Sequence, residues 1–222
     1  MTDESVPSPV SPLEDLGYFV EWGGQAWERL TAMALREFIG TRLDGQQILE
    51  IGTRYGKMAT LFALLGGQVT GIDLREECLA AAEDESRKWG VAERVTFRAY
   101  DGELDRFAEN SFDLVFTKSV LVVVPRLEEF LRKIEARLKP GGKVVFLENG
   151  RGGRLLHALR ALKHRSWYKK ARYFTDRELD LVRTVFQVKT VRRTRLPPVY
   201  LIMGYRRLPE GVGPRKPAEP NA

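Results

Sequence analysis

The chain has 222 residues, of which 43% are hydrophobic and 30% are charged, a composition that suits one folded domain with one substantial core. Its single cysteine, Cys78, excludes an intrachain disulfide and any zinc site built from paired cysteines. No segment reaches the roughly 18 apolar residues of a membrane span, and residues 1–12 lack the basic and apolar regions of a signal peptide. We therefore expect a soluble, cytoplasmic protein.

The net charge of +6 is distributed unevenly along the chain. Residues 1–150 contain 18 Lys and Arg against 25 Asp and Glu, whereas residues 151–222 contain 18 against 5. Such a basic block is most often a solvated face, although it can also meet an anionic partner such as a nucleic acid. Residues 1–12 and 208–222 are rich in Pro, Gly, Ser and charge, so we expect mobile tails there.

The first predicted element is an amphipathic helix over Trp27–Leu43, which could cover the core or close over a ligand. From Gln47 onward, short apolar segments alternate with longer segments of helical period. The predicted strands, rich in Val, Ile, Leu and Phe, are Ile48–Ile51, Gln68–Asp73, Arg94–Tyr100, Phe112–Thr117 and Lys143–Glu148. Strands of this composition are buried on both faces, which indicates a parallel sheet.

The segments between these strands are predicted helices, and glycines or a Pro-Gly turn follow them where a helix must end. They cover Ala59–Leu65, Glu76–Trp89 and Leu127–Leu138. Near the end of the chain, Thr175 and Glu178 form a capping-box pattern that predicts a helix to about Val185. Phe186–Arg193 and Val199–Arg206 then predict an antiparallel hairpin.

Together these elements predict one doubly wound α/β domain over residues 13–207. Residues 13–45 would form an N-terminal helical cap, and residues 150–173 a basic insertion after the fifth strand. No internal repeat is present, so a repeat architecture is excluded.

The turn after the first strand, Glu50 to Gly56, is the first candidate binding site. In a doubly wound sheet, ligands bind beyond the carboxyl ends of the strands, and this turn makes much of the contact. Gly52 would let the backbone approach a ligand, Gly56 would let the next helix pack near the strand, and the amides at the helix start suit a carboxylate. By themselves, the two glycines are equally typical of a purely structural turn.

Acidic residues close the second and third predicted strands. Asp73 lies where a carboxylate can accept both ribose hydroxyls of a nucleoside, although it could also be a helix N-cap. Asp101 and Gly102 lie where a carboxylate can accept the exocyclic amine of adenine, although they could also form a plain turn. The strand ends together favour an adenosine that carries a carboxylate over a dinucleotide, which would require a fuller glycine pattern.

Four segments, in this order, resemble the successive motifs of class I S-adenosylmethionine-dependent methyltransferases. They are Ile48–Gly56, Val69–Asp73, Phe112–Phe116 and Leu138–Gly142. The resemblance covers roughly Gln47 to Arg207 and implies a Rossmann-like methyltransferase fold, with a seven-stranded sheet in the order 3-2-1-4-5-7-6 and strand 7 antiparallel. It also implies S-adenosylmethionine as the cofactor and methyl transfer from its sulfonium to a nucleophile. The cofactor contacts expected on this basis are Glu50, Gly52, Thr53, Arg54, Gly56, Asp73, Leu74, Asp101, Gly102 and Thr117.

The sequence departs from the family pattern in two places. Many members have a third glycine in the first turn, where this chain has Arg54, which could pair with the methionyl carboxylate or point to solvent. Small-molecule methyltransferases of the family often carry a His pair after the fourth strand, where this chain has Val122 to Pro125. An acid–base role at those positions is therefore excluded.

The catalytic candidates are few because a sulfonium is already an activated methyl donor, and alignment of the acceptor does much of the work. Candidate bases are His157, His164 and Glu148, and Lys118 could orient the acceptor or carry charge. Each has an ordinary alternative: the His residues could lie on the surface, Glu148 could cap the next segment, and Lys118 could form a salt bridge. No metal site is expected.

The acceptor side has two sequence features. Leu121–Val124 could line it with apolar surface or simply pack in the core. The basic segment Arg151–Tyr173 could be an acceptor lid, a helix on a membrane surface, or plain packing. The family's signature for methylating planar amino groups, Asn or Asp followed by Pro-Pro and an aromatic residue, is absent after the fourth strand, which argues against adenine and glutamine-amide acceptors.

Three functions are compatible with these observations. The leading hypothesis is methyl transfer to a small-molecule acceptor, such as a natural product or lipid-like compound. The second is RNA methylation that uses the basic C-terminal third. The third is a non-methylating descendant that uses the bound cofactor structurally, since a fold does not fix a function.

Overall fold

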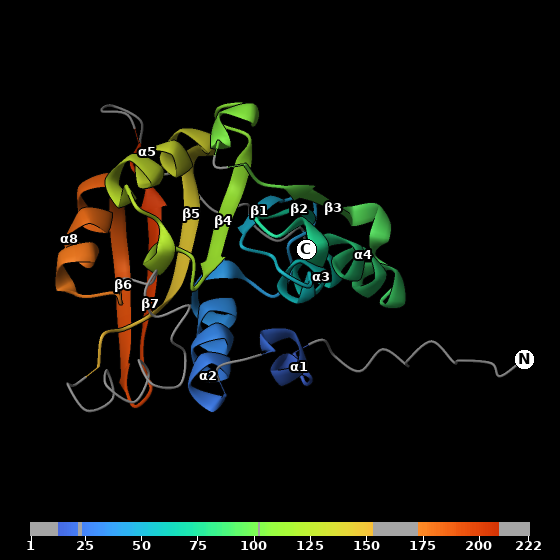
Figure 1. Ribbon diagram of the computed structural model, residues 1–222, viewed down its shortest axis with the longest axis horizontal. Helices are drawn as coiled ribbons and strands as arrows, with labels where there is room; N and C mark the ends of the chain where they lie inside the picture. The colour runs from blue at the N-terminus through green and yellow to red at the C-terminus, as the bar shows by residue number, and fades with distance from the viewer. Residues whose placement is uncertain (1–12, 22–23, 102, 153–172, 209–222) are drawn as a thin grey trace, which may run out of the picture.

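The computed structural model describes residues 13–21, 24–101, 103–152 and 173–208. Its centre is a seven-stranded sheet in the order β3-β2-β1-β4-β5-β7-β6 (Figure 1). The strands are β1 (Gln47–Ile51), β2 (Gln68–Asp73), β3 (Val95–Ala99), β4 (Phe112–Lys118), β5 (Leu138–Asn149), β6 (Phe186–Arg195) and β7 (Pro198–Arg206). The first five are parallel, and β7 is antiparallel to both β5 and β6. The predicted α/β class, strand order and antiparallel seventh strand are confirmed.

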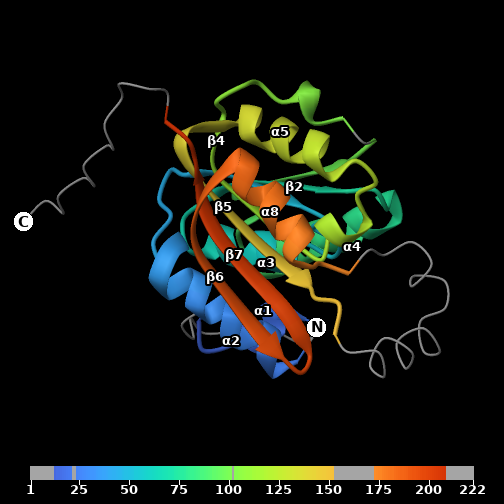
Figure 2. The same cartoon turned by 90° about the vertical axis from the view of Figure 1, so that its left-hand side faces the viewer.

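One face of the sheet is covered by the N-terminal helices and by the helices that follow β1 and β2 (Figure 2). These are α1 (Leu16–Val20), α2 (Gln25–Ala34), α3 (Lys57–Leu64) and α4 (Leu79–Lys88). Trp27 of α2 is 2% exposed and belongs to the same buried cluster as Leu201 and Met203 of β7. Helix α2 therefore covers the sheet, which is one of the two roles expected for the N-terminal segment.

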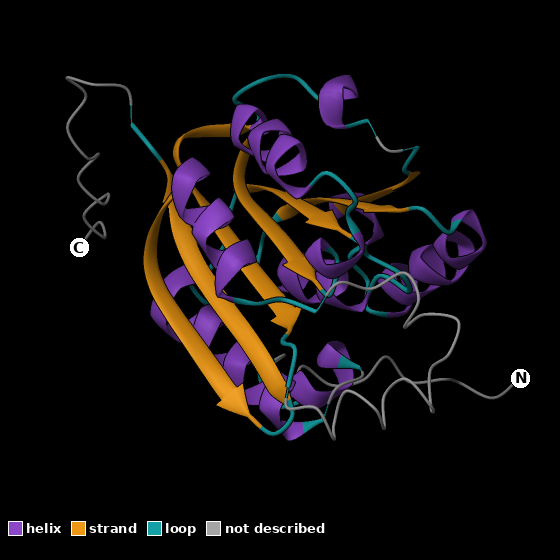
Figure 3. Cartoon of the chain, turned by 60° about the vertical axis from the view of Figure 1, so that its left-hand side comes forward, coloured by secondary structure: helices purple, strands orange, loops and turns teal. Residues whose placement is uncertain are grey.

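The opposite face carries α5 (Leu127–Arg137) and α8 (Asp176–Val185), so the strands lie between two helical layers (Figure 3). Apolar residues spaced three or four apart place one side of α5 in the core, with Leu131 and Ile134 fully buried. Helix α8 begins at the predicted capping box, in which Thr175 and Glu178 satisfy each other's backbone amides. This start signal is confirmed.

Two predicted boundaries differ from the structure. The predicted helix Trp27–Leu43 begins at Gln25, continues as a π-helical turn over Leu35–Ile39 and ends at Gly40, whose φ is 108°. The fifth strand begins at Leu138 rather than Lys143, because the Pro-Gly segment stays paired to β4 through a register shift between Phe112 and Leu114. A β-bulge of this kind absorbs extra residues without ending the strand.

Several predicted segments lie outside the described residues. They are residues 1–12, residues 208–222 apart from Leu208, and most of the insertion at 150–173. Their expected roles as tails and lid stay predictions. Among the described helices, none is long and apolar enough to cross a membrane.

Candidate cofactor-binding site

A cavity of about 990 Å³ lies beyond the carboxyl ends of β1, β2 and β4. Its lining includes the end of α1, the turns after β1, β2, β3 and β4, the first turns of α5 and the end of β5. The sheet topology dictates this position, because parallel strands present their carboxyl ends at one edge and the winding direction reverses between β1 and β4. The cavity therefore lies where a doubly wound sheet binds its ligand.

The turn after β1 depends on two glycines with different roles. Gly52 lines the cavity with φ 82°, and a Cβ atom there would lie 2.4 Å from Cγ2 of Val120. Gly56 has φ 71° and is not among the lining residues. A Cβ atom at Gly56 would lie 2.7 Å from Phe97 of β3 and 2.8 Å from Ala82 of α4. Gly56 therefore acts by letting the turn pack against β3 and α4. It does not make the direct cofactor contact that was predicted for it.

Asp73, at the end of β2, is held in place by two backbone amides. Its carboxylate accepts hydrogen bonds from the amide of Arg54 at 2.8 Å and from the amide of Arg75 at 2.9 Å, and the residue is 8% exposed. A carboxylate has about four acceptor positions, so lone pairs are left for two hydroxyl donors. Leu74 is 69% exposed beside it and also lines the cavity. This arrangement fits the predicted contact between Asp73 and a ribose.

The amides of the turn are largely used within the protein. Gly52 and Thr53 both donate to the carbonyl of Ile72, at 2.7 and 3.0 Å. Arg54 donates to Asp73, and Gly56 donates to the carbonyl of Thr53 at 2.9 Å. These four amides are engaged within the protein. The expectation concerned the amides at the start of α3, where Lys57 and Met58 line the cavity, and it stays a prediction. A cationic side chain, that of Arg54, also lines the cavity.

Glu50 stabilises the turn from inside. It is 3% exposed and accepts a hydrogen bond from the hydroxyl of Thr53 at 2.8 Å. Burial raises the pKa of Glu50 to about 8, because desolvation disfavours the charged form. Both residues border the cavity, so they lie where cofactor contacts were predicted, and the bond between them fixes the shape of the turn.

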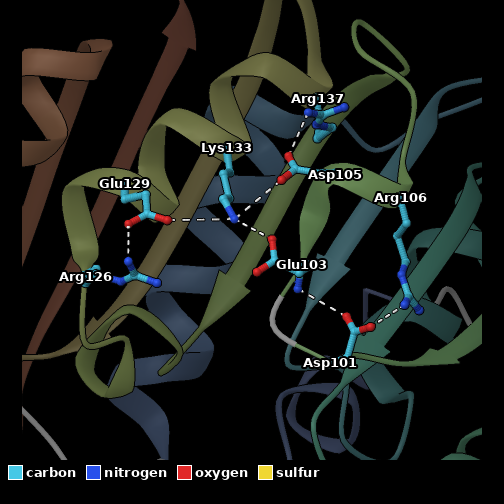
Figure 4. A network of polar contacts seen from close by, with 8 residues as sticks. All are labelled: Asp101, Glu103, Asp105, Arg106, Arg126, Glu129, Lys133 and Arg137. Atoms are coloured by element: carbon cyan, nitrogen blue, oxygen red, sulfur yellow. Dashed lines mark hydrogen bonds and ion pairs between the residues drawn. The ribbon is translucent and has the colours of Figure 1, made fainter.

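The end of β3 differs from the expectation. The side chain of Asp101 is 54% exposed, forms an ion pair with Arg106 and accepts from the amide of Glu103 at 3.2 Å, and it does not line the cavity. Glu103 does line it, and its carboxylate lies 2.5 Å from Nζ of Lys133 on α5 (Figure 4). The local ion pair thus directs Asp101 away from the predicted adenine contact, and Gly102 lies outside the described residues.

Thr117 near the end of β4 and Glu148 near the end of β5 are fully buried and do not line the cavity. Glu148 accepts from the hydroxyl of Thr117 at 3.0 Å and from the amides of Val120 and Leu121 at 3.2 and 3.1 Å. Burial raises the pKa of Glu148 to about 7. Glu148 therefore holds the turn after β4, and its expected role as a base that faces the acceptor is corrected. The predicted cofactor contact of Thr117 is corrected for the same reason.

Lys118 is the predicted catalytic candidate that the structure places in the cavity wall. Its ammonium group donates to the carbonyl of Val20 at the end of α1 and lies 5.6 Å from the ring of Trp27. Burial lowers the pKa of Lys118 to about 8, because a partly desolvated ammonium is disfavoured. His157 and His164 lie outside the described residues.

The segment Leu121–Val124 divides between its two expected roles. Val123 and Val124 line the cavity, whereas Leu121 and Val122 are at most 2% exposed and belong to the core beneath α5. With Val120 and Phe130, the two lining valines make one side of the cavity apolar.

The lining residues that were not predicted include Glu21, Ser119 and Asn149, and Tyr173 at the end of the predicted lid segment also lines the cavity. Asn149 at the end of β5 donates to the hydroxyl of Ser119 at 2.5 Å, and the backbone beside Tyr173 joins the same strand end through a bond from the amide of Phe174 to the carbonyl of Asn149. These residues come from separate segments, so no local spacing relates them. The position of Asn149 one residue after the fifth predicted strand was the one usable signal.

Part of the chain is similar to known proteins. Residues 49–146 match the sequence model of the methyltransferase domain. The ubiquinone biosynthesis O-methyltransferase of Xanthomonas euvesicatoria pv. vesicatoria (strain 85-10) is 38% identical over 112 residues, which are 49% of this chain and 46% of that protein. The chain spans less than half the length of the curated relatives it matches first.

Two solved structures share the fold. A SAM-dependent methyltransferase from Methanosarcina mazei is 24% identical, with a TM-score of 0.63 over 76% of this chain and 96% of that one. The (4+2)-cyclase SpnF is 17% identical, with a TM-score of 0.69 over 86% and 85%. The fold is therefore that of the class I S-adenosylmethionine-dependent methyltransferases.

The residues that match the methyltransferase domain, 49–146, extend from β1 into β5. Fold and domain identify S-adenosylmethionine as the cofactor. The cavity fits that group, because the Asp73 carboxylate lies where a ribose is held and Leu74 offers an exposed apolar side chain beside it. Asp73, Gly52 and the turn that follows would hold the cofactor.

Proposed function

We propose that the chain transfers a methyl group from S-adenosylmethionine to a small, largely apolar acceptor. The observation that carries this proposal is the continuity of the cavity. Gly52 and Asp73, which are predicted to bind the nucleoside, share it with the apolar wall of Val120, Val124 and Phe130. A donor and an acceptor can therefore meet in one cavity.

The residues of this chain would contribute position and exclusion of water rather than strong acid–base chemistry. When bound, S-adenosylmethionine supplies an electrophilic methyl group. The apolar wall would shield the reacting atoms from water, and the Ser119–Asn149 pair would offer hydrogen bonds that orient a polar atom of the acceptor. Lys118 would stabilise negative charge on an acceptor oxygen, as an ammonium group in the same wall.

The relatives support an acceptor of this kind without fixing its identity. The matched Xanthomonas protein is an O-methyltransferase of ubiquinone biosynthesis, and we extend to this chain only the class of acceptor: a small molecule with an apolar body and an oxygen nucleophile. The basic C-terminal third, which motivated the RNA hypothesis, lies partly outside the described residues and does not strengthen that alternative.

The test is a turnover assay with methyl-labelled S-adenosylmethionine and a panel of hydrophobic phenols, quinols and fatty acids, with RNA as a separate arm. We expect labelled product and equimolar S-adenosylhomocysteine with at least one small acceptor. The Lys118→Met variant should keep cofactor affinity but lose turnover. Label transfer to RNA alone would contradict the proposal, and so would cofactor binding without S-adenosylhomocysteine release across the whole panel.

A further inference from the structure

The turn between β6 and β7 presents a leucine to solvent. Leu196 is 79% exposed, the largest exposed fraction among the large hydrophobic side chains that the structure describes. The hydroxyl of Thr194 donates to the carbonyl of Pro197 at 2.5 Å and accepts from the amide of Val199 at 3.1 Å. The turn is therefore held by its own hydrogen bonds, and Leu196 lies at the tip of a hairpin of fixed shape.

This hairpin tip lies at the edge of the sheet where the cavity lies. Strand β7 is antiparallel to both β5 and β6, so β6 runs in the same direction as β5 and ends at the same edge. Asn149, which lines the cavity, pairs with Val199, and the amide of Gly150 donates to the carbonyl of Pro198 at 2.9 Å. The hairpin extends beyond the end of β4 (Figure 1), so its tip projects on the cavity side of the molecule.

The strand that leads to the tip is basic. Strand β6 contains Lys189, Arg192, Arg193 and Arg195 and no acidic residue. Arg193 forms an ion pair with Asp176, whereas neither Arg192 nor Arg195 has an ion-pair or hydrogen-bond partner among the described residues, and both are exposed. Because successive residues of a strand point to opposite faces, Arg192 and Arg195 flank the tip on both sides of the hairpin.

Each of these features has an ordinary explanation when it is taken alone. Single exposed leucines are common on proteins, and basic residues on an edge strand hinder its pairing with another sheet. Protection of the edge accounts for the arginines but not for a leucine at the tip. An apolar side chain beside cations without partners suits an anionic lipid surface, where apolar burial and charge attraction act together. Single-stranded nucleic acid would favour exposed aromatic residues, and those of the hairpin, Phe186, Tyr200 and Tyr205, are at least partly buried.

We propose that the hairpin tip docks on an anionic phospholipid surface, with Leu196 in the apolar boundary and Arg192 and Arg195 against the lipid phosphates. One leucine and two free arginines give weak, reversible binding rather than a permanent anchor. Docking turns the cavity side of the sheet toward the membrane, in which apolar molecules dissolve. The inference goes beyond the proposed function and does not depend on it, because docking requires neither cofactor nor acceptor.

The test is co-sedimentation of the full chain with vesicles of phosphatidylcholine, either alone or mixed with phosphatidylglycerol. We expect binding to the mixed vesicles and binding weaker by about 10-fold or more to phosphatidylcholine alone. Raising the salt from about 0.1 to 1 M should weaken binding, because the Debye length falls from about 10 to about 3 Å. Leu196→Ser should weaken binding to the mixed vesicles roughly 5- to 10-fold, and the double variant Arg192→Gln/Arg195→Gln on the order of 10-fold.

Two controls separate docking at the tip from the overall charge of the chain. The double variant Arg42→Gln/Arg94→Gln removes the same net charge near the amino ends of β1 and β3, at the opposite edge of the sheet, and it should bind as wild type does. Leu196→Trp introduces a side chain that favours the membrane interface, and it should bind at least as tightly as wild type. Urea unfolding of each variant shows that it is folded.

Several results would overturn the proposal. They are the absence of wild-type binding to the mixed vesicles, equal binding to both kinds of vesicle, unchanged binding by Leu196→Ser, and an equal loss in the control double variant. Binding to an RNA oligonucleotide of mixed sequence without binding to vesicles would overturn it as well, and would assign the basic hairpin to RNA. None of these results bears on methyl transfer, which the turnover assay measures without vesicles.

Discussion

Replacement of Glu148 by Gln changes the group that holds the turn after β4. The carboxylate is fully buried, and one of its oxygens accepts from the hydroxyl of Thr117 and from the amides of Val120 and Leu121. Burial nevertheless raises the pKa of Glu148 from 4.5 to about 7, because desolvation of the charge outweighs these hydrogen bonds. The folded state therefore binds a proton at this site more tightly than the unfolded state does.

The pH dependence follows from this difference. Below a pH near 4.5, the carboxyl group is protonated in both states and causes no penalty. Between that pH and about 7, the folded state binds more protons, so the free energy of unfolding falls as pH rises. Above about pH 7 the loss of unfolding free energy caused by the buried charge is constant, and the whole pKa difference corresponds to about 3 kcal/mol. A glutamine at this position carries no such titration.

Urea unfolding of wild type and Glu148→Gln at several values between about pH 4.5 and 8.5 measures the effect. The difference in unfolding free energy should shift in favour of the variant by about 3 kcal/mol up to pH 7 and then stay level. Glu50 titrates in both proteins, so its contribution cancels. A difference that is constant across the range, or that shifts in favour of wild type, would refute the reasoning.

Two further substitutions test the cavity wall. Gly52→Ala should lower the unfolding free energy by roughly 2–3 kcal/mol, because φ is 82° and the new Cβ atom would meet Val120 at 2.4 Å; chemical denaturation checks this. Gly90→Ala, with φ 68° but no atom within 4 Å, should cost only about 1 kcal/mol. The unfolding free energy of Lys118→Met should rise relative to that of wild type by roughly 3 kcal/mol as pH falls from about 10.5 to 8, because the unfolded wild-type chain takes up the lysine proton first; pH-dependent unfolding measures this difference.

The sequence predicted the parts of the fold that depend on local pattern. Strands β1, β2 and β4 were visible because residues such as Ile48, Val115 and Phe116 are buried in the sheet, and this gives continuous apolar segments. The capping box at Thr175 was visible because its two partners are three residues apart. The π-helical turn at Leu35–Ile39 was not, because its residues have the same amphipathic pattern as an α-helix.

The residues of the candidate site were likewise predicted only where a local sequence pattern marks them. Gly52 and Asp73 were predicted because each occupies a fixed place at the end of a strand. Glu21 and Asn149 were missed because they reach the cavity only through tertiary packing of α1 and β5. Asp101 was assigned to adenine because sequence spacing cannot show that Arg106, five residues later, forms an ion pair with its carboxylate.

The most direct measurement of the central claim is the affinity of S-adenosylhomocysteine for wild type, Asp73→Ala and Asp73→Asn by calorimetry. The account predicts binding to wild type and a loss on the order of 10-fold or more in Asp73→Ala, because two ribose hydroxyls lose a charged acceptor. Asp73→Asn retains one acceptor oxygen for the amides of Arg54 and Arg75, and it should lie between the two. Absence of binding to wild type, or equal affinity in Asp73→Ala, would contradict the account.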